Sequence, residues 1–110
     1  MKIVFNELKE TPIPEFNSGM GTTILRMFED KKVKILFGRL EKNASVGLHS
    51  HMTSCEVIFV LSGEGMVLCD GEMEPIKPGD CHYCPKGHSH SLINKGSEEL
   101  IFWAVVPEQE

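Results

Sequence analysis

The sequence predicts an all-β protein, built as a sandwich or a barrel. Short apolar segments recur along the chain, and clusters of Gly, Pro, Asn, Asp and Ser separate them. No stretch shows the three-to-four-residue spacing of apolar side chains that is typical of an amphipathic helix. Together these observations favour roughly nine short strands in one fold.

Length and charge limit the classes of protein to which this chain can belong. Its 110 residues suffice for one domain with a modest core, which we assign to residues 1–110. With 11 basic and 16 acidic residues the net charge is −5, which disfavours a nucleic-acid partner. No apolar segment approaches the length of a membrane span, and the N-terminus lacks the apolar core of a signal peptide. The sequence therefore predicts a cytoplasmic protein that binds neither nucleic acid nor membrane.

The first forty residues contain several extended segments. Ile3–Phe5 is a short apolar candidate strand, and the two prolines within residues 11–14 impose an extended backbone. Residues 23–28 and 33–40 are predicted to be two strands joined by a polar turn. Arg39 ends an otherwise apolar face of the second strand, where it could bind a substrate carboxylate. We favour the other interpretation, in which its long side chain reaches water at the rim.

The middle of the chain continues the pattern of strands and turns. Residues 57–61 are an unbroken apolar run. Residues 66–69 and 73–76 are predicted to form a hairpin around Asp70-Gly71, a favoured two-residue turn. Residues 77–80, Lys-Pro-Gly-Asp, have the central Pro and Gly of a type II turn.

The remaining strands are predicted over residues 81–84 and 100–106. The runs 57–61 and 101–106 are apolar at every position, so both faces of these strands are apolar. One face can pack into the interior, whereas the other needs a cover. We therefore predict a homodimer in which a second subunit provides that cover.

The four cysteines are predicted to be reduced thiols and not metal ligands, because disulfides are rare in the cytoplasm. Cys81 and Cys84 form a C-x-x-C pair, but a zinc knuckle needs a second pair of ligands at matching spacing. A thioredoxin-type pair should open a helix, whereas Pro85 follows here. We interpret these residues as buried or half-buried structural thiols, beside Cys55 and Cys69.

Histidine and glutamate residues at the edges of predicted strands indicate a metal site. His49 and His51 are two residues apart, so on a strand both point to one side, and Glu56 opens the following apolar run. Imidazole nitrogens and a carboxylate are ligands for divalent transition metals. A surface loop rich in His and Glu would look similar, but the turn beside each residue favours a metal site. A further ligand would come from His88 or His90, between which spacing alone does not choose.

Residues 79–94 contain five residues at the spacing G-x5-P-x-G-x2-H-x3-N, namely Gly79, Pro85, Gly87, His90 and Asn94. This stretch resembles the second sequence motif of the cupin superfamily at every fixed position. The match includes His90 and leaves His88 outside the pattern. The resemblance therefore implies that His90 is the ligand. We expect His88, one residue after Gly87, to lie at the barrel mouth, where it would contact a ligand residue or face the substrate.

Residues 47–63 resemble the first cupin motif, G-x5-H-x-H-x3,4-E-x6-G. The chain matches it at His49, His51, Glu56 and Gly63. It departs at the leading glycine, because one residue separates Gly47 from His49 where the motif has five. We expect this departure to fall at a turn and to alter the loop without altering the ligands.

The resemblance implies a single-domain cupin jelly-roll β-barrel with a metal inside one open end. The implied ligands are His49, His51, Glu56 and His90, holding one divalent transition metal ion per chain, namely Zn, Mn, Fe or Ni. Similar cupins include enzymes on small polar metabolites, of the oxygenase, isomerase, lyase or decarboxylase type, and also non-catalytic modules that bind or sense a small ligand. The sequence offers no clear second catalytic group. The nearby candidates are Arg39, Tyr83, His82 and His88.

Overall fold

The prediction of an all-β fold is confirmed. The computed structural model describes residues 1–109, which form ten strands and two short 3-10 helices and contain no α-helix. In chain order the elements are η1 (Phe5–Glu7), β1 (Thr11–Pro14), η2 (Phe16–Ser18), β2 (Thr22–Glu29), β3 (Val33–Leu40), β4 (Ser45–Ser50), β5 (Glu56–Ser62), β6 (Gly65–Cys69), β7 (Glu72–Ile76), β8 (Cys81–Cys84), β9 (Ser89–Asn94) and β10 (Leu100–Pro107). Within this part of the chain, no helix has the length and hydropathy needed to cross a lipid bilayer.

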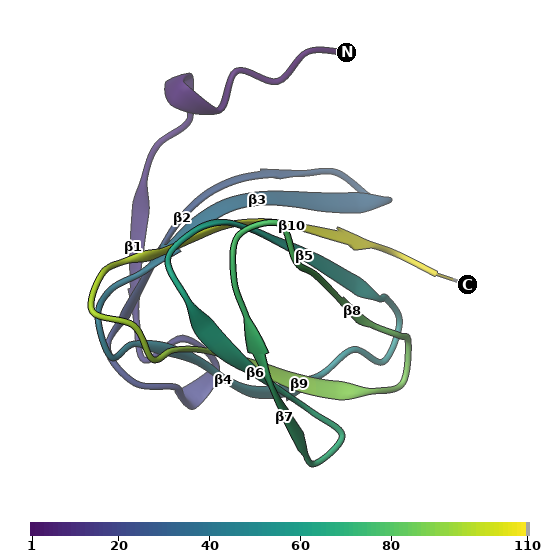
Figure 1. Ribbon diagram of the computed structural model, residues 1–110. Coiled ribbons are helices and arrows are strands. Elements are labelled where there is room, and N and C mark those ends of the chain that lie inside the picture. Colours follow the sequence, from purple (N-terminus) through teal and green to yellow (C-terminus); the bar gives the residue numbers. More distant parts are fainter. Residues whose placement is uncertain (110) are drawn as a thin grey trace.

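The strands form two antiparallel sheets that face each other across the interior (Figure 1). The larger sheet has the order β1-β2-β3-β10-β5-β8, and the smaller has the order β4-β9-β6-β7. The late strands β10 and β9 each lie between two earlier strands, β10 between β3 and β5 and β9 between β4 and β6. Such insertion of late strands between early ones is typical of a jelly roll, which is the predicted barrel.

Alternating side chains of both sheets fill the space between them. Ile58 and Val60 of β5 are buried, as are Phe102 and Ala104 of β10. Leu92 of β9 joins them from the smaller sheet in the same apolar cluster. Because side chains in a strand alternate between two faces, every second residue reaches this shared core.

The outer face of the larger sheet is also apolar. Phe59 and Leu61 of β5 alternate with the buried residues and are 42% and 43% exposed. On the neighbouring strand Trp103 lies between Phe5 and Phe37, with ring centroids 4.8 and 4.7 Å from its own. The N-terminal segment thus covers one part of this face and leaves the β5 side open.

The prediction of a strand at Ile3–Phe5 is wrong. Phe5 begins η1, and the segment crosses the outer face instead of joining a sheet. The Arg26 guanidinium donates hydrogen bonds to the backbone carbonyls of Phe5, Asn6 and Leu8, at 3.3, 3.1 and 2.7 Å. A charged side chain therefore takes the place of the neighbouring strand that would otherwise bind these carbonyls.

The predicted turns are confirmed. Asp70 and Gly71 join β6 to β7 with φ angles of 51° and 84°, as a type I′ hairpin turn requires. In the turn before β8, Gly79 has a φ of 93°, and the N–H of Asp80 donates to the Lys77 carbonyl at 3.0 Å. These short turns set the register of the strands that follow them.

Candidate metal centre

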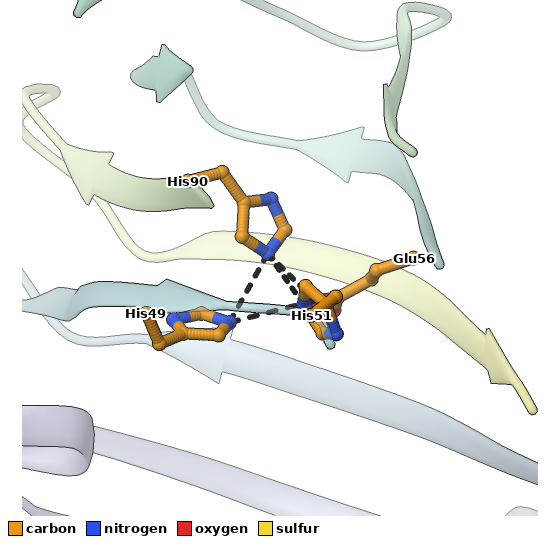
Figure 2. Close-up of side chains that lie close together, drawn as sticks. All are labelled: His49, His51, Glu56 and His90. Carbon is orange, nitrogen blue, oxygen red and sulfur yellow. Dashed lines mark hydrogen bonds and ion pairs between the residues drawn. The ribbon is translucent and has the colours of Figure 1, made fainter. Parts of the chain in front are cut away.

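The four residues predicted as ligands meet between the two sheets. His49 lies in β4 of the smaller sheet and is directly opposite His90 in β9. His51 follows the end of β4, and Glu56 opens β5 of the larger sheet. Figure 2 shows the four side chains pointing toward one another. The pairing of β4 with β9 thus joins residues about forty positions apart in the sequence.

The distances between their donor atoms are short. Nε2 of His90 lies 2.8 Å from Oε1 of Glu56, 2.9 Å from Nε2 of His51 and 3.1 Å from Nε2 of His49. Oε1 of Glu56 lies 2.9 Å from Nε2 of His51 and 3.7 Å from Nε2 of His49. Two ligands at right angles around an ion, each about 2.1 Å from it, are about 3.0 Å apart. The spacing and the donor types therefore fit a cluster that could bind one metal ion.

Each histidine of the cluster has a hydrogen-bond partner at its other ring nitrogen. Nδ1 of His49 lies 2.8 Å from the carbonyl oxygen of Gly47, which can only accept, so this nitrogen carries a proton. Nδ1 of His51 lies 3.1 Å from Oγ of Ser54, and Nδ1 of His90 lies 3.0 Å from Nε2 of His82. Both partners can accept a hydrogen bond from an Nδ1–H group. The arrangement suits rings that turn an unprotonated Nε2 toward the centre.

The charges of the cluster favour a cation. Glu56 is 8% exposed, and burial would raise the pKa of its carboxyl. Hydrogen bonds with the rings of His49, His51 and His90 outweigh burial and hold that pKa well below its usual range. Burial lowers the pKa of His49, but its contacts with Glu56 and with the Gly47 carbonyl together outweigh burial and leave that pKa raised. The buried carboxylate of Glu56 is therefore ionised, and its negative charge favours binding of a positive charge among the imidazoles, either a proton or a metal ion.

The position of the motif's leading glycine, with five residues between it and His49, is held by Asn43, which lies in a turn with a φ of 65°, so the departure falls at a turn as expected. Gly47 is within β4, where the register against β9 shifts between Val46 and His49, as at a β-bulge. A Cβ atom at this position would lie 2.0 Å from the carbonyl oxygen of Asn17 in η2. Glycine therefore allows η2 to approach the bulge, and the bulge presents the carbonyl that binds His49.

The motif residue Asn94 stabilises the end of β9 by binding backbone groups. Its buried Nδ2 donates to the carbonyls of Leu40, Glu41 and Glu98, at 3.1, 3.1 and 2.8 Å. Its Oδ1 accepts from the N–H of Gly96 at 3.0 Å. Asn94 thus anchors the loop at the far end of the strand that carries His90.

Arg39 does not face the cluster. Its neighbour Leu40 is fully buried, so Arg39 points to the outer face of the larger sheet. There its guanidinium donates to Glu10 at 3.0 Å and also pairs with Glu99. Arg39 thus lies at the rim, as expected, but its guanidinium binds two carboxylates and not only water. Tyr83 of β8 is 55% exposed and likewise points away from the cluster, because its neighbour His82 contacts His90 from the other face of the strand.

The expected role of His88 beside the cluster is wrong, and His82 has that place instead. The ring of His88 is exposed and contacts the carboxylate of Asp70 in the β6–β7 hairpin. His82 of β8 reaches Nδ1 of His90 from the larger sheet. The sequence contained one indication that His82 points inward. His82 is two residues from Cys84, which was predicted to be buried or half-buried, and residues two apart in a strand share a face. Only the approach of β8 to β9 shows which face points to His90.

The four cysteines are free thiols in the structure. Cys55 and Cys84 are buried, Cys69 is partly buried and Cys81 is exposed. The expectation of a buried or half-buried thiol is therefore wrong for Cys81, because residues three apart in β8 face opposite sides. Burial raises the pKa of Cys84 to about 12.

A cavity of about 430 Å³ borders the cluster. All four cluster residues line it, together with side chains of both sheets. The volume falls in the range of small-molecule sites, about 300–1,000 Å³. The cluster can therefore be reached by a small molecule, and the protein surrounds such a molecule with its own side chains.

Known proteins of similar sequence are named for binding or converting small molecules. The chain is 41% identical over 73 residues to an oxalate-binding protein of Thermotoga maritima. The matched region covers 64% of this chain and 60% of that protein. It is 33% identical over 64 residues to a glucose-6-phosphate isomerase of Thermococcus gammatolerans, covering 54% of this chain and 34% of the isomerase. The chain thus spans less than two thirds of the length of either relative.

Solved structures and a family model identify the fold family. The crystal structure of a "predicted oxalate decarboxylase" of Thermotoga maritima superposes with a TM-score of 0.92 at 31% identity, over 98% of this chain and 99% of the other. A sugar phosphate isomerase of the cupin superfamily from Silicibacter pomeroyi shares the fold, with a TM-score of 0.79 at 21% identity over 99% and 76% of the two chains. Residues 36–106 match the Cupin_2 model, described as a cupin domain. The chain therefore belongs to the cupin family.

Proposed function

We propose that His49, His51, Glu56 and His90 bind one divalent transition metal ion per chain, which is Zn, Mn, Fe or Ni. The observation that carries this proposal is the convergence of three Nε2 atoms and one carboxylate oxygen, with the opposite nitrogen of every ring held by a partner. Four protein ligands leave a six-coordinate ion with open positions. A small molecule in the adjoining cavity would bind at those positions.

We propose further that the protein is a metal-dependent enzyme acting on a small polar metabolite, by oxygenase, isomerase, lyase or decarboxylase chemistry. The bound ion would supply Lewis-acid polarisation or a site for dioxygen. The chain itself contributes orientation and exclusion of water, because the cluster lies between two packed sheets. The relatives named as a predicted oxalate decarboxylase and as sugar isomerases support a small-molecule substrate.

The second candidate is a non-catalytic module that binds or senses a small ligand. Beyond the cluster, the polar residues among the described lining of the cavity are Asn17, Lys34, Ser54 and Glu108. Three of these are exposed, and Ser54 is engaged with His51. Within residues 1–109, the cavity lining thus holds no buried acid or base outside the cluster, and one relative is named for binding alone. Metal-dependent turnover in screens against metabolite pools would support the enzyme, and saturable thermal shifts without turnover would support the module.

Elemental analysis of natively purified protein tests the metal proposal. We expect about one equivalent of a single transition metal per chain in the unaltered protein. His90→Ala should lose this metal, because it removes the imidazole that contacts the other three donor atoms. His88→Ala is the matched control and should retain it, because His88 contacts Asp70 outside the cluster. Metal loss in the His88 variant alone would show that the ligand set is wrong.

We also propose a domain organisation, an oligomeric state and a cellular location. We propose that residues 1–110 form one cupin domain, which is supported by the single apolar core that both sheets share. We propose a homodimer, supported by the exposed apolar side chains Phe59 and Leu61 on the larger sheet. We propose a cytoplasmic location, supported by four free thiols in one small chain.

A further inference from the structure

The cavity beside the cluster is apolar over most of its wall. Its buried apolar lining comes from both sheets and consists of Leu25, Val46, Ile58, Leu92 and Phe102, and Ser54 is the buried polar residue of the lining outside the cluster. The cavity measures about 430 Å³. A water molecule occupies about 30 Å³ of the liquid, so this volume corresponds to roughly fourteen waters. A ligand of only a few atoms, such as oxalate, would leave most of this wall uncovered.

The charged groups of the cavity lie at its exposed edge. Lys34 and Glu108 are the charged lining residues outside the cluster, within the described chain, and both are exposed. The ammonium of Lys34 lies 3.8 Å from a carboxylate oxygen of Glu29. The apolar wall therefore contains no buried charge apart from the cluster itself.

Neither arginine of the chain reaches the cavity. Arg26 donates to three backbone carbonyls of the N-terminal segment. Arg39 binds Glu10 and Glu99 on the outer face. A guanidinium is the group that best binds a carboxylate or a phosphate in two-point contact. A ligand with a second anionic group, such as a sugar phosphate or a dicarboxylate, would find only the exposed Lys34 ammonium.

We infer that this site takes a ligand with one polar, metal-chelating head and an apolar body of several carbon atoms. The inference rests on the proposed metal centre and adds the class of ligand that it holds. The head binds at the cluster, where polar donors are concentrated. The body lies against the apolar wall, since burying apolar surface is favourable and burying unpartnered polar groups is costly. Acids with a 2-oxo group and an alkyl chain have this chemistry.

A series of 2-oxo acids that share one head and differ in the tail tests this inference. The probes are pyruvate, 2-oxobutanoate, 2-oxopentanoate and 4-methyl-2-oxopentanoate, with oxalate and 2-oxoglutarate as fully polar references. Binding is measured by isothermal titration calorimetry to the Mn²⁺-loaded protein and to the EDTA-treated protein. We expect the dissociation constant of the loaded protein to fall about threefold to fourfold per added methylene. Both references should bind more weakly than the longest tail.

Two matched variants test whether the missing cation decides the selectivity. Met27 lines the cavity and is 46% exposed, so Met27→Arg places a guanidinium at its edge without removing a buried side chain. Met73 is 50% exposed on β7 and does not line the cavity, so Met73→Arg adds the same charge elsewhere. Met27→Arg should tighten 2-oxoglutarate binding at least threefold, and Met73→Arg should leave it unchanged.

The outcomes separate this inference from the metal proposal. Tighter binding with tail length in the loaded protein supports both. Metal-dependent binding that weakens with tail length, or that is tightest for oxalate, overturns the inference and leaves the metal centre standing. A tail dependence that is equal with and without metal overturns the chelated head and leaves the apolar body standing. If none of the probes binds either form of the protein, the inference is overturned, and elemental analysis decides the metal centre separately.

Discussion

Nε2 of His82 lies 3.0 Å from Nδ1 of His90, so a histidine of the larger sheet contacts a histidine of the smaller one. Burial lowers the pKa of His82, which keeps its ring neutral and able to accept a hydrogen bond. When His82 accepts at this atom, His90 carries its proton on Nδ1 and turns an unprotonated Nε2 to the cluster. We therefore assign His82 as a positioning residue for His90.

The first prediction concerns this contact. His82→Ala should weaken metal binding about 10-fold to 100-fold, because the partners of ligating histidines fix their tautomer and orientation. His82→Asn, which can still offer an acceptor, should recover part of the loss. Competition with a chelating dye gives the affinity, and the visible spectrum of the Co²⁺-loaded protein reports the ligand geometry. An unchanged spectrum and affinity in His82→Ala would remove His82 from the site. His88→Ala serves as the control.

The second prediction concerns pH and has opposite signs with and without metal. In the metal-free protein the pKa of His49 is raised above its ordinary value of 6.5, so its contribution to stability is present below pH 6.5 and lost as pH rises through the raised pKa. The pKa of Glu56 is lowered, so its contribution persists throughout this range and is lost only under acid conditions. The melting temperature in EDTA should therefore fall as the pH rises from 6.5 to 8.

The metal-loaded protein should show the reverse trend. A metal ion binds only unprotonated rings, so raising the pH from 6 to 8 increases its affinity and its stabilising effect. Thermal melting at matched pH values, with EDTA and with excess Zn²⁺, compares the two forms. His49→Asn should flatten the trend of the metal-free protein. Parallel trends in both forms would refute the assignment of His49 to the cluster.

The third prediction concerns the thiols. Cys81 is exposed and should react first with a thiol reagent in the native protein. Cys84 is buried, and its raised pKa of about 12 leaves almost no thiolate at neutral pH, so it should react only after unfolding. Titration of the denatured, non-reduced protein should find four thiols per chain. Loss of bound metal from Cys81→Ser or Cys84→Ser would show instead that a thiol belongs to the metal site.

The fourth prediction concerns the proposed dimer. Light scattering at micromolar concentration should give twice the chain mass of 12.3 kDa. Phe59→Glu should shift the protein toward that single-chain mass, because it places a charge in the middle of the exposed apolar face of β5. Met73→Glu, at an exposed position of the smaller sheet, should leave the mass unchanged. A single-chain mass for the unaltered protein would exclude the dimer at this concentration.

Apart from the segment Ile3–Phe5, the sequence alone determined the predicted strands and the turns between them, because both depend on local chemistry. The Asp70-Gly71 turn needs two positive φ angles, and these residue types tolerate them. The grouping of His49, His51, Glu56 and His90 was also predictable, although His90 was separated from His88 only by the likeness to a family motif. Periodicity by itself places His88 and His90 on the same side of a strand.

Only the tertiary structure decided what surrounds these residues. The pairing of β4 with β9 and the approach of β8 show that His82, and not His88, contacts the ring of His90. The contact of Arg39 with Glu10 on the outer face likewise depended on which face of β3 packs into the core. Such contacts join residues of different strands and sheets, and local propensity carries no information about which strands become neighbours. Their positions follow from the burial of apolar side chains by the chain as a whole.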